Sequence, residues 1–509
     1  MRLVHSIASW IMKKRLHSIE LFMQYPEEVQ GDVLEQLIQR ATPTSWGETY
    51  DYASLKGRDD FVRRVPLQYY NSLEPWITRM MEGERHVLWP GKTKWFAQSS
   101  GTSGGPRKFI PVSKESLENC HFKGGKDMLA LYLANHSESS LFEGKNLIVG
   151  GSAQVHELNP NAYYGDLSSI IIQNFPFWAQ FRQAARKSLT LLPDWESKLQ
   201  QITERVCEED VTMLSGVPSW NMVLLRRVLE YSGAQTIAEV WPNLELYVWG
   251  GMSLGIYKEQ FDRLLGKPIN YLQTYNASEG FFGIQDRFTQ GVDDMLLMLD
   301  YGIYYEFIPE SFWNDEQPKT LAIHEVALEE RYELVISTNG GMWRYRTGDV
   351  VQFTSLSPFR IKVAGRTSYS INLVGEELME SHVQQVLPRI CKQHNAEIEE
   401  YTIGPSTQVH QGVARHEWFI EWNRVPSDLE GFTRDLDEGL MQANCDYAAK
   451  RHNDLVLEEL HIKSMPQGHF YQWLSREGRL GGQVKVPRMR GDRSILDSVL
   501  KIPSTKYPF

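Results

Sequence analysis

Cysteine is scarce in this chain, and the cysteines are not spaced as in a disulfide framework or a structural zinc site. The 509 residues include four cysteines, none in a Cys-x-x-Cys pair: Cys120, Cys207, Cys391 and Cys445. A disulfide framework or a structural zinc site would need paired or clustered cysteines. The fourteen histidines include no His-Glu-x-x-His motif, which excludes the common zinc metalloproteases. This cysteine usage favours a reducing, cytoplasmic location.

Long apolar runs are also missing. The apolar stretch at residues 3–12 is far shorter than the roughly 20 residues that a membrane-spanning helix needs. Only Arg2 precedes it and three basic residues, 13–15, follow it, which reverses the charge order of a secretory signal peptide. We therefore expect an amphipathic helix packed on the body of the protein, with no membrane contact. Apolar spacing then predicts two helices over residues 13–41, the second starting at Pro26.

Positive charge is in deficit, with 53 basic against 64 acidic residues and a formal net charge of -11. An acidic surface repels a phosphate backbone, so nucleic acid is not an expected partner. An anionic small substrate would need a locally basic site that is rich in backbone amides. The hydrophobic content of 42% is that of a globular protein, and a chain of this length usually forms more than one domain.

From about residue 94 onward, short apolar runs alternate with helical patterns. The clearest strand candidates are residues 147–149, 244–249 and 333–337. Glycine pairs follow the first two, and a helical pattern at residues 256–265 follows the second. This alternation predicts an α/β fold with its site at the strand ends. Near Gly365 the pattern changes to one typical of a smaller α+β domain. We therefore expect a large domain, 1–364, and a small one, 365–509.

The segment SSGTSGGPRK, residues 99–108, joins three glycines, four hydroxyls and two cations. Such a loop can wrap an anion, although flexible turns also use these residues. A Walker-type loop would lead into a helix, whereas the residues after Lys108 look extended. The segment also contains Gly-x-Ser-x-Gly, but Pro106 does not suit the helix that follows a nucleophilic serine. The composition favours phosphate binding.

A second Gly-x-Ser-x-Gly, at residues 251–255, lies between a predicted strand and a predicted helix. That is the setting of a hydrolase nucleophile, so a serine hydrolase using Ser253 stays open as an alternative. Glycine and serine also crowd strand-to-helix turns for purely structural reasons.

Three later clusters carry further chemistry: TYNASEG at residues 274–280, YRTGD at 345–349 and GGQVKVPR at 481–488. The first is expected in a loop after a strand, and the second at the end of an apolar stretch. The third places a lysine between glycines near the C-terminus. Each alone could be a turn, a salt bridge or a surface loop. Together and in this order they form a specific combination.

With these motifs the chain resembles the acyl-acid amido synthetases of the auxin-responsive family, in its bacterial branch. The marks are SSGTSGGPRKFIP, YNASEG, YRTGDVV and GGQVKVPR, and the similarity runs the whole length. The superfamily also contains acyl-CoA synthetases, peptide-synthetase adenylation domains and luciferases. The resemblance implies a large N-terminal adenylate-forming domain with mixed and parallel sheets flanked by helices, and a small, mobile C-terminal domain.

The resemblance also implies a nucleotide site. The ATP phosphates would be held by Ser99, Ser100, Gly101, Thr102, Ser103 and Lys108. Tyr275 would lie on the adenine face, with Gly250 and Gly251 against the adenine edge. The remaining nucleotide-binding positions would be Asn276, Ala277 and Ser278.

Four charged residues are implied to act on the ribose, the metal and the reacting phosphate. Glu279 would bind Mg²⁺, and Asp349 would accept both ribose hydroxyls. Arg366 would lie near the ribose or the α-phosphate. Lys485, counted with Lys108 as catalytic, would reach in from the small domain and stabilise the α-phosphate transition state.

The implied reaction is adenylation of a carboxylic acid by ATP, with release of pyrophosphate, followed by acyl transfer to an amine, by family likeness an amino acid. Residues 364–370 would form the hinge, although Ser368 replaces the acid that the superfamily usually has there. A thioester-forming ligase using coenzyme A stays open. Six aromatic residues could line an acyl pocket or simply form core: Tyr163, Tyr164, Phe175, Phe177, Trp178 and Phe181.

Overall fold

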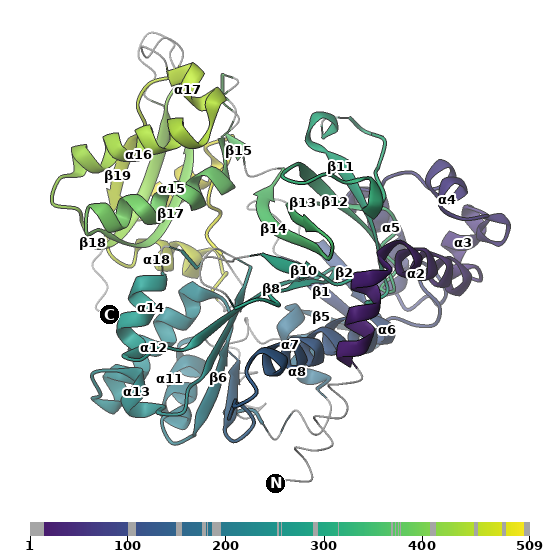
Figure 1. The fold of residues 1–509 in the computed structure, drawn as a ribbon, viewed down its shortest axis with the longest axis horizontal. Helices are drawn as coiled ribbons and strands as arrows, with labels where there is room; N and C mark the ends of the chain where they lie inside the picture. Colours follow the sequence, from purple (N-terminus) through teal and green to yellow (C-terminus); the bar gives the residue numbers. More distant parts are fainter. Residues whose placement is uncertain are drawn as a thin grey trace.

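The computed structural model of the protein is shown in Figure 1. It describes residues 15–99, 108–148, 155–175, 180, 182–185, 195–251, 254–255, 257–288, 294–313, 315–367, 370–371, 373–374, 376, 378–407, 414–451, 457–480 and 485–502. Within these ranges, no helix is both long enough and apolar enough to cross a membrane.

The described part of the chain begins with helices, as its apolar spacing predicts. Residues 15–24 are helical, and α2 begins at Pro26, where the fixed φ of proline suits the first turn. The helices of this region are α2 (Pro26–Ala41), α3 (Ser45–Thr49), α4 (Arg58–Arg64) and α5 (Tyr70–Met81). The apolar residues 3–12 lie outside the described ranges, so the expected amphipathic helix there stays a prediction.

A mixed sheet of ten strands forms the centre of the molecule, in the order β11-β12-β13-β14-β10-β9-β8-β7-β6-β3. The strands are β3 (Lys145–Ile148), β6 (Val211–Ser215), β7 (Leu246–Gly250), β8 (Asn270–Ala277), β9 (Gly280–Ile284), β10 (Met295–Leu297), β11 (Ile303–Pro309), β12 (Arg331–Thr338), β13 (Tyr345–Leu356) and β14 (Phe359–Arg366). From β3 to β8 the neighbours are parallel, and from β8 to β11 they are antiparallel. The predicted α/β architecture with mixed and parallel strands is confirmed.

Helices accompany the parallel half of the sheet, in the lower left of Figure 1: α11 (Trp195–Val206), α12 (Pro218–Ser232), α13 (Ile237–Val240) and α14 (Lys258–Leu265). The helix predicted over residues 256–265 is α14, which follows β7 after a short turn. α12 and α14 both end at a glycine with positive φ, Gly233 and Gly266, where a side chain would be strained. The turn between β7 and α14 lies at the carboxyl end of a parallel strand, where α/β folds bind ligands.

A smaller sheet carries the phosphate-loop candidate. Its order is β2-β1-β5-β4, with β1 (Trp95–Ser99), β2 (Lys108–Val112), β4 (His156–Asn159) and β5 (Ala162–Gly165). β1 and β2 are antiparallel, and Ser99 is paired with Lys108. The predicted loop therefore connects two paired strands, and the extended conformation expected after Lys108 is confirmed. The nearby helices are α6 (Lys114–Ser116), α7 (Phe122–Asn135) and α8 (Leu167–Gln173).

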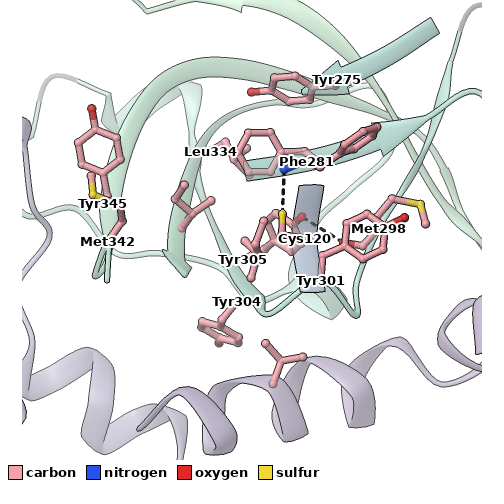
Figure 2. Packing of buried hydrophobic residues seen from close by; sticks show 14 of the residues in the cluster. Cys120, Tyr275, Phe281, Met298, Tyr301, Tyr304, Tyr305, Leu334, Met342 and Tyr345 are labelled. Atoms are coloured by element: carbon pink, nitrogen blue, oxygen red, sulfur yellow. Dashed lines mark hydrogen bonds between the residues drawn. The ribbon is translucent and has the colours of Figure 1, made fainter. Parts of the chain in front are cut away.

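The core beneath the central sheet holds the β8–β9 hairpin in place. Phe281, at the start of β9, is buried, and its backbone N–H donates to Cys120 Sγ at 3.2 Å (Figure 2). A side chain at Gly124 of α7 would collide with the Phe281 ring, so glycine lets this helix approach the hairpin closely. The motif carried by the hairpin thus rests on a tightly packed base.

The C-terminal part, yellow-green in Figure 1, has its own sheet of β17 (Glu397–Pro405), β18 (His416–Arg424) and β19 (His461–Met465). Its remaining elements are β15 (Ser370–Ile371), β16 (Leu378–Met379), α15 (Glu380–Gln393), α16 (Leu429–Ala443), α17 (Cys445–Arg451), α18 (His469–Arg476) and α19 (Ser494–Leu500). Residues 416–422, in which polar and apolar side chains alternate, lie in β18. Trp418 and Ile420 enter a core within the C-terminal part, whereas Phe419 enters the core shared with α12 and α14.

The expected domain boundary falls inside a strand. β14 continues to Arg366, and Gly365 is paired with Val350 of β13. The core of the C-terminal part begins a few residues later, at Ile371. We use "N-terminal part" for the chain up to Arg366 and "C-terminal part" for the chain from Ser370 onward.

Candidate active site

A hydrogen-bonded trio lies where β8, β13 and β14 approach one another. Tyr275 Oη donates to Asp349 Oδ2 at 2.6 Å, and Arg366 Nε lies 2.7 Å from Asp349 Oδ1. Asp349 and Arg366 are also register partners in adjacent strands. Burial, reinforced by the negative charge of Asp349, raises the pKa of Tyr275 well above its ordinary value, so this hydroxyl is a neutral donor. Each carboxylate oxygen keeps a further lone pair for another donor.

The YRTGD segment does not lie where the sequence predicted. It was expected to end an apolar stretch, but it opens β13. Between Arg346 and Val350 the pairing with β12 shifts, so three residues stand opposite Leu334 alone. Thr347 Oγ1 donates to the Leu334 carbonyl at 2.8 Å and accepts the Asp349 N–H at 3.0 Å, and Gly348 has a φ of 75°. A bulge of this kind redirects side chains, and here it fixes the backbone at Asp349.

The TYNASEG segment also departs from the expectation of a loop. Its first four residues belong to β8, and Gly280 already belongs to β9. Ala277 is paired with Gly280, so Ser278 and Glu279 form a two-residue hairpin turn. Burial raises the pKa of the Glu279 carboxyl, and the negative charge of Asp349 raises it further. The hairpin therefore places a carboxylate near the trio.

A lysine from the far end of the chain reaches this region. Lys485 Nζ donates to the carbonyl oxygen of Gly251, from a position 234 residues later in the sequence. Gly251 has a φ of 79°, a backbone conformation that favours glycine, and a Cβ there would displace the tip of Lys485. Burial and, to a lesser degree, the positive charge of Arg366 lower the pKa of Lys485 to about 8, although Asp349 and Glu380 oppose the shift.

Lys108 belongs to the same cluster. Its Nζ donates to Tyr345 Oη at 3.4 Å and lies 5.7 Å from the centre of the Tyr70 ring. Burial lowers the pKa of Lys108, while the negative charges of Glu279 and Asp349 act in the opposite direction. The trio, the hairpin carboxylate and both lysines are thus brought together.

Tyr70 and Tyr345 are two site residues that sequence reasoning did not single out. Besides its contact with Lys108, Tyr70 Oη accepts the backbone N–H of Phe109 at 2.8 Å, which fixes the start of β2. Tyr345 opens the YRTGD motif, so the motif itself was a signal for it. Tyr70 lies at the start of α5, and no local pattern distinguishes it there.

The remaining predicted nucleotide residues divide into those the structure describes and those it does not. Ser100, Gly101, Thr102 and Ser103 lie outside the described residues, and Ser99 is described through its backbone pairing. Asn276 Oδ1 lies 3.1 Å from His121 Nδ1, and burial lowers the pKa of that histidine to about 4. The histidine is therefore neutral near pH 7 and donates to this amide oxygen.

Three more of the predicted nucleotide residues lie in or directly after paired strands: Gly250, Ala277 and Ser278. A side chain at Gly250 would collide with the backbone carbonyl of Thr274, so β7 and β8 can pair here only with glycine. Ala277 ends β8 and Ser278 begins the hairpin turn. Their proposed contacts with a nucleotide stay predictions.

The aromatic residues proposed for an acyl pocket are only partly described. Tyr163 packs against Trp95 with ring centres 5.3 Å apart, and Tyr164 packs edge-on against Phe109 at 5.4 Å. Phe175 contacts Phe122 at 6.3 Å, and the other three residues lie outside the described ranges. These ring contacts are compatible with either of the two interpretations.

Within the residues that the structure describes, no three His, Cys, Asp or Glu side chains gather as a metal-binding group. A single carboxylate is nevertheless compatible with Mg²⁺, which is commonly held by one or two carboxylates together with substrate phosphates. Glu279 fits that pattern, because burial and the nearby charge of Asp349 raise its pKa and disfavour its negative charge, which a bound cation would compensate.

The chain matches the sequence models of three consecutive domains of one family. These are the GH3 family N-terminal domain at residues 15–269, the central domain at 296–366 and the C-terminal domain at 381–494. The chain therefore belongs to the GH3 family, and the predicted family is confirmed. Its bacterial branch stays a prediction.

Named relatives and solved structures agree with this assignment. The indole-3-acetic acid-amido synthetase GH3.4 of Arabidopsis thaliana is 22% identical, over 93% of this chain and 91% of the relative. The structure of the GH3.15 acyl acid amido synthetase superposes with a TM-score of 0.78 at 17% identity, covering 96% of this chain and 95% of that one. A 2-hydroxyisobutyryl-CoA ligase in complex with an acyl-AMP has the same fold, with a TM-score of 0.57 at 14% identity and coverage of 93% and 90%.

Proposed function

We propose that this protein is an ATP-dependent ligase that adenylates a carboxylic acid and then transfers the acyl group to an amine. One observation carries the proposal: Lys485 of the C-terminal part bonds to Gly251, beside the site in which Asp349 is held by Tyr275 and Arg366. The names of the similar proteins support it, because they include amido synthetases and a ligase bound to an acyl-AMP.

In the first half-reaction a carboxylate oxygen of the acid attacks the α-phosphorus of ATP. The bond between the α-phosphorus and the bridging oxygen breaks, pyrophosphate leaves, and an acyl-adenylate remains. Negative charge grows on the α-phosphate in the transition state, so cations held nearby stabilise it most. Lys485 and Arg366 supply those cations. With a pKa of about 8, Lys485 is mainly protonated at neutral pH.

The nucleotide is held by the residues built into the sheets. Asp349 accepts the ribose hydroxyls on the lone pairs that Tyr275 and Arg366 leave available. Tyr275 lies on the adenine face, and its ring is fixed by packing on Phe282 at 4.8 Å. The adenine edge lies against Gly250 and Gly251.

The phosphates lie against the loop between β1 and β2, where hydroxyls and backbone amides surround them: Ser99, Ser100, Gly101, Thr102 and Ser103. Lys108, fixed beside Tyr345, adds a positive charge. Asn276, Ala277 and Ser278 line the nucleotide from the hairpin. Glu279 holds Mg²⁺, which neutralises phosphate charge when bound.

In the second half-reaction an amine attacks the acyl carbon, the bond to AMP breaks, and an amide forms. An amino acid is the proposed amine, and coenzyme A is the alternative acceptor. We propose a large domain, 1–364, and a small mobile domain, 365–509, whose residues from Ser370 onward move and withdraw Lys485 after adenylation. The protein works in the cytoplasm.

The serine hydrolase alternative concerns the same turn between β7 and α14. Ser253 itself lies outside the described residues. The first glycine of that Gly-x-Ser-x-Gly segment, Gly251, uses its carbonyl to bind Lys485. A turn that shapes the adenine wall and receives the lysine accounts for the glycines without a nucleophile.

A library of carboxylic acids, incubated with the protein, ATP and Mg²⁺, tests the proposal through pyrophosphate release. The expected result is pyrophosphate and AMP with a subset of acids, followed by an amide when amino acids are added. A thioester formed with coenzyme A, and no amide, would select the alternative acceptor. Release of ADP, or ester hydrolysis without ATP, would contradict the proposal.

A further inference from the structure

The segment that carries Lys485 is fixed to β17 of the C-terminal part by its backbone. Thr402 Oγ1 donates to the carbonyl of Pro487 at 2.6 Å, and the Ile403 N–H donates to the Arg488 carbonyl at 2.9 Å. The Arg490 N–H then donates back to Ile403 at 3.0 Å. The position of Lys485 therefore follows the position of β17.

Arg488 connects this segment to the N-terminal part. Its guanidinium pairs with Glu400, donates to the Tyr401 carbonyl at 3.1 Å and lies 4.4 Å from the centre of the Tyr401 ring, all within the C-terminal part. Its Nη2 also donates to Tyr257 Oη at 3.1 Å, and Tyr257 lies directly before α14 of the N-terminal part. One buried hydrogen bond thus joins the two parts three residues after the lysine.

The Tyr257 hydroxyl uses both of its hydrogen-bonding functions across this boundary. It accepts from Arg488 and donates to the carbonyl of Glu399 in β17 at 3.2 Å. The rest of the side chain is buried in the core shared by α12 and α14, with 1% of the residue exposed. The ring is therefore packed in a core to which both parts contribute, while the two hydrogen bonds of its hydroxyl go to the C-terminal part.

Two hydrogen bonds from the lysine segment to the N-terminal part fall on the same turn. Lys485 bonds to Gly251 at the start of the turn, and Arg488 bonds to Tyr257 at its end. A lysine side chain has four flexible carbons, so one contact at its tip leaves many conformations open. A second attachment fixes the backbone from which the lysine extends, and orientation of this kind accelerates a reaction without touching the substrate.

Other contacts cross the same boundary. Apolar residues of the C-terminal part share a buried core with α12 and α14, and Gln260 donates to the Ile398 carbonyl at 3.1 Å. Two ion pairs across the boundary are more exposed. Arg226 pairs with Glu399 at 2.9 Å and Arg263 pairs with Glu397 at 2.6 Å, with 39% and 53% of the arginine side chains exposed. Exposed ion pairs contribute little and are screened by salt. Arg488 is 6% exposed, so its bond to Tyr257 is protected from solvent and weighs more.

We propose that Tyr257 is a positioning residue that holds Lys485 in place for adenylation, acting through Arg488 and the carbonyl of Glu399. The proposal rests on the proposed function, because it presumes that Lys485 acts in the first half-reaction. If the C-terminal part then moves to admit the amine, these bonds break, so Tyr257 matters for the first half-reaction and not for the second.

Tyr257→Phe tests this, because it removes the hydroxyl and keeps the buried ring. Tyr247→Phe is the matched control: Tyr247 lies in the same core, and its Oη donates at 3.0 Å to the carbonyl of Gly216, within the N-terminal part. With the acid that gives the most pyrophosphate in the library, the adenylation rate of Tyr257→Phe should fall about tenfold, the scale of one hydrogen bond to a charged group. The rate at which an amino acid consumes the matching synthetic acyl-adenylate should stay within about twofold of the parent.

A second measurement needs no substrate. Hydrogen–deuterium exchange of residues 485–490 should accelerate in Tyr257→Phe and stay at the parent rate in Tyr247→Phe. Equal loss in both half-reactions, or unchanged adenylation together with unchanged exchange, would overturn the positioning role. A parent that releases no pyrophosphate with any acid would instead refute the proposed function, while the exchange measurement would still decide whether Tyr257 docks this segment.

Discussion

The two sides of the candidate site are built in different ways. On one side, Asp349 is held by Arg366 from the adjacent strand β14 and by Tyr275 from β8 of the same sheet, and a bulge fixes its backbone. On the other side, Lys485 belongs to the C-terminal part and reaches the site through contacts that cross between the two parts. The nucleotide side is therefore preformed, whereas the lysine side depends on how the two parts are docked. An enzyme with two successive half-reactions needs this difference, because only the second side has to change between them.

The largest expected effect comes from breaking the preformed side. Asp349→Ala removes the ribose acceptor and leaves the Tyr275 hydroxyl and the Arg366 guanidinium without their partner. Because the acyl-adenylate keeps the ribose, both half-reactions should fall, adenylation by roughly 10³-fold. Measuring the two half-reactions separately checks this expectation. A loss confined to adenylation would show that the two sides do not differ as described.

The next effect concerns the carboxylate of the hairpin turn. Glu279→Gln keeps the size of the side chain and removes its charge, so Mg²⁺-dependent adenylation should fall by about 10²-fold. Consumption of a synthetic acyl-adenylate should change little, because pyrophosphate has already left. Pyrophosphate release measured across a Mg²⁺ titration gives the result. Release at the parent rate would mean that Glu279 does not bind the metal.

Much of this arrangement could be predicted from the sequence. The four motifs, the helix starting at Pro26 and the strands at 244–249 and 333–337 are local patterns, so they were found. The TYNASEG and YRTGD segments were misplaced because a two-residue turn and a bulge interrupt the alternation that marks a strand. Tyr70 and Tyr257 act through contacts with residues far away in the sequence, and no local pattern records such contacts.

A smaller effect should appear in the pH dependence of adenylation. Burial lowers the pKa of Lys485 to about 8, so the lysine loses its positive charge as the pH rises through that value. If the charge is required, the adenylation rate should decline above pH 8, approaching tenfold per unit. The second half-reaction should not decline there, since its amine becomes more nucleophilic on losing a proton. Adenylation that stays level to pH 9.5 would speak against a role for the charge.

The smallest effect is expected at Ser253. Ser253→Ala should leave adenylation within about twofold of the parent, because the turn contributes its backbone and not a nucleophile. Ester hydrolysis without ATP serves as the comparison. Parent esterase activity that disappears in this variant would establish the hydrolase and remove the basis for the comparison of the two sides.

The comparison of the two sides is tested most directly by Lys485→Ala, with both half-reactions measured on the same preparation. The account predicts that adenylation falls by about two to three orders of magnitude, the scale of one lost transition-state donor. ATP binding should change far less, since Asp349 and Tyr275 remain, and consumption of a synthetic acyl-adenylate by an amino acid should continue. Equal loss in both half-reactions would mean that Lys485 supports the structure in general. No loss in either would mean that Lys485 belongs to an ordinary surface loop and has no role in catalysis.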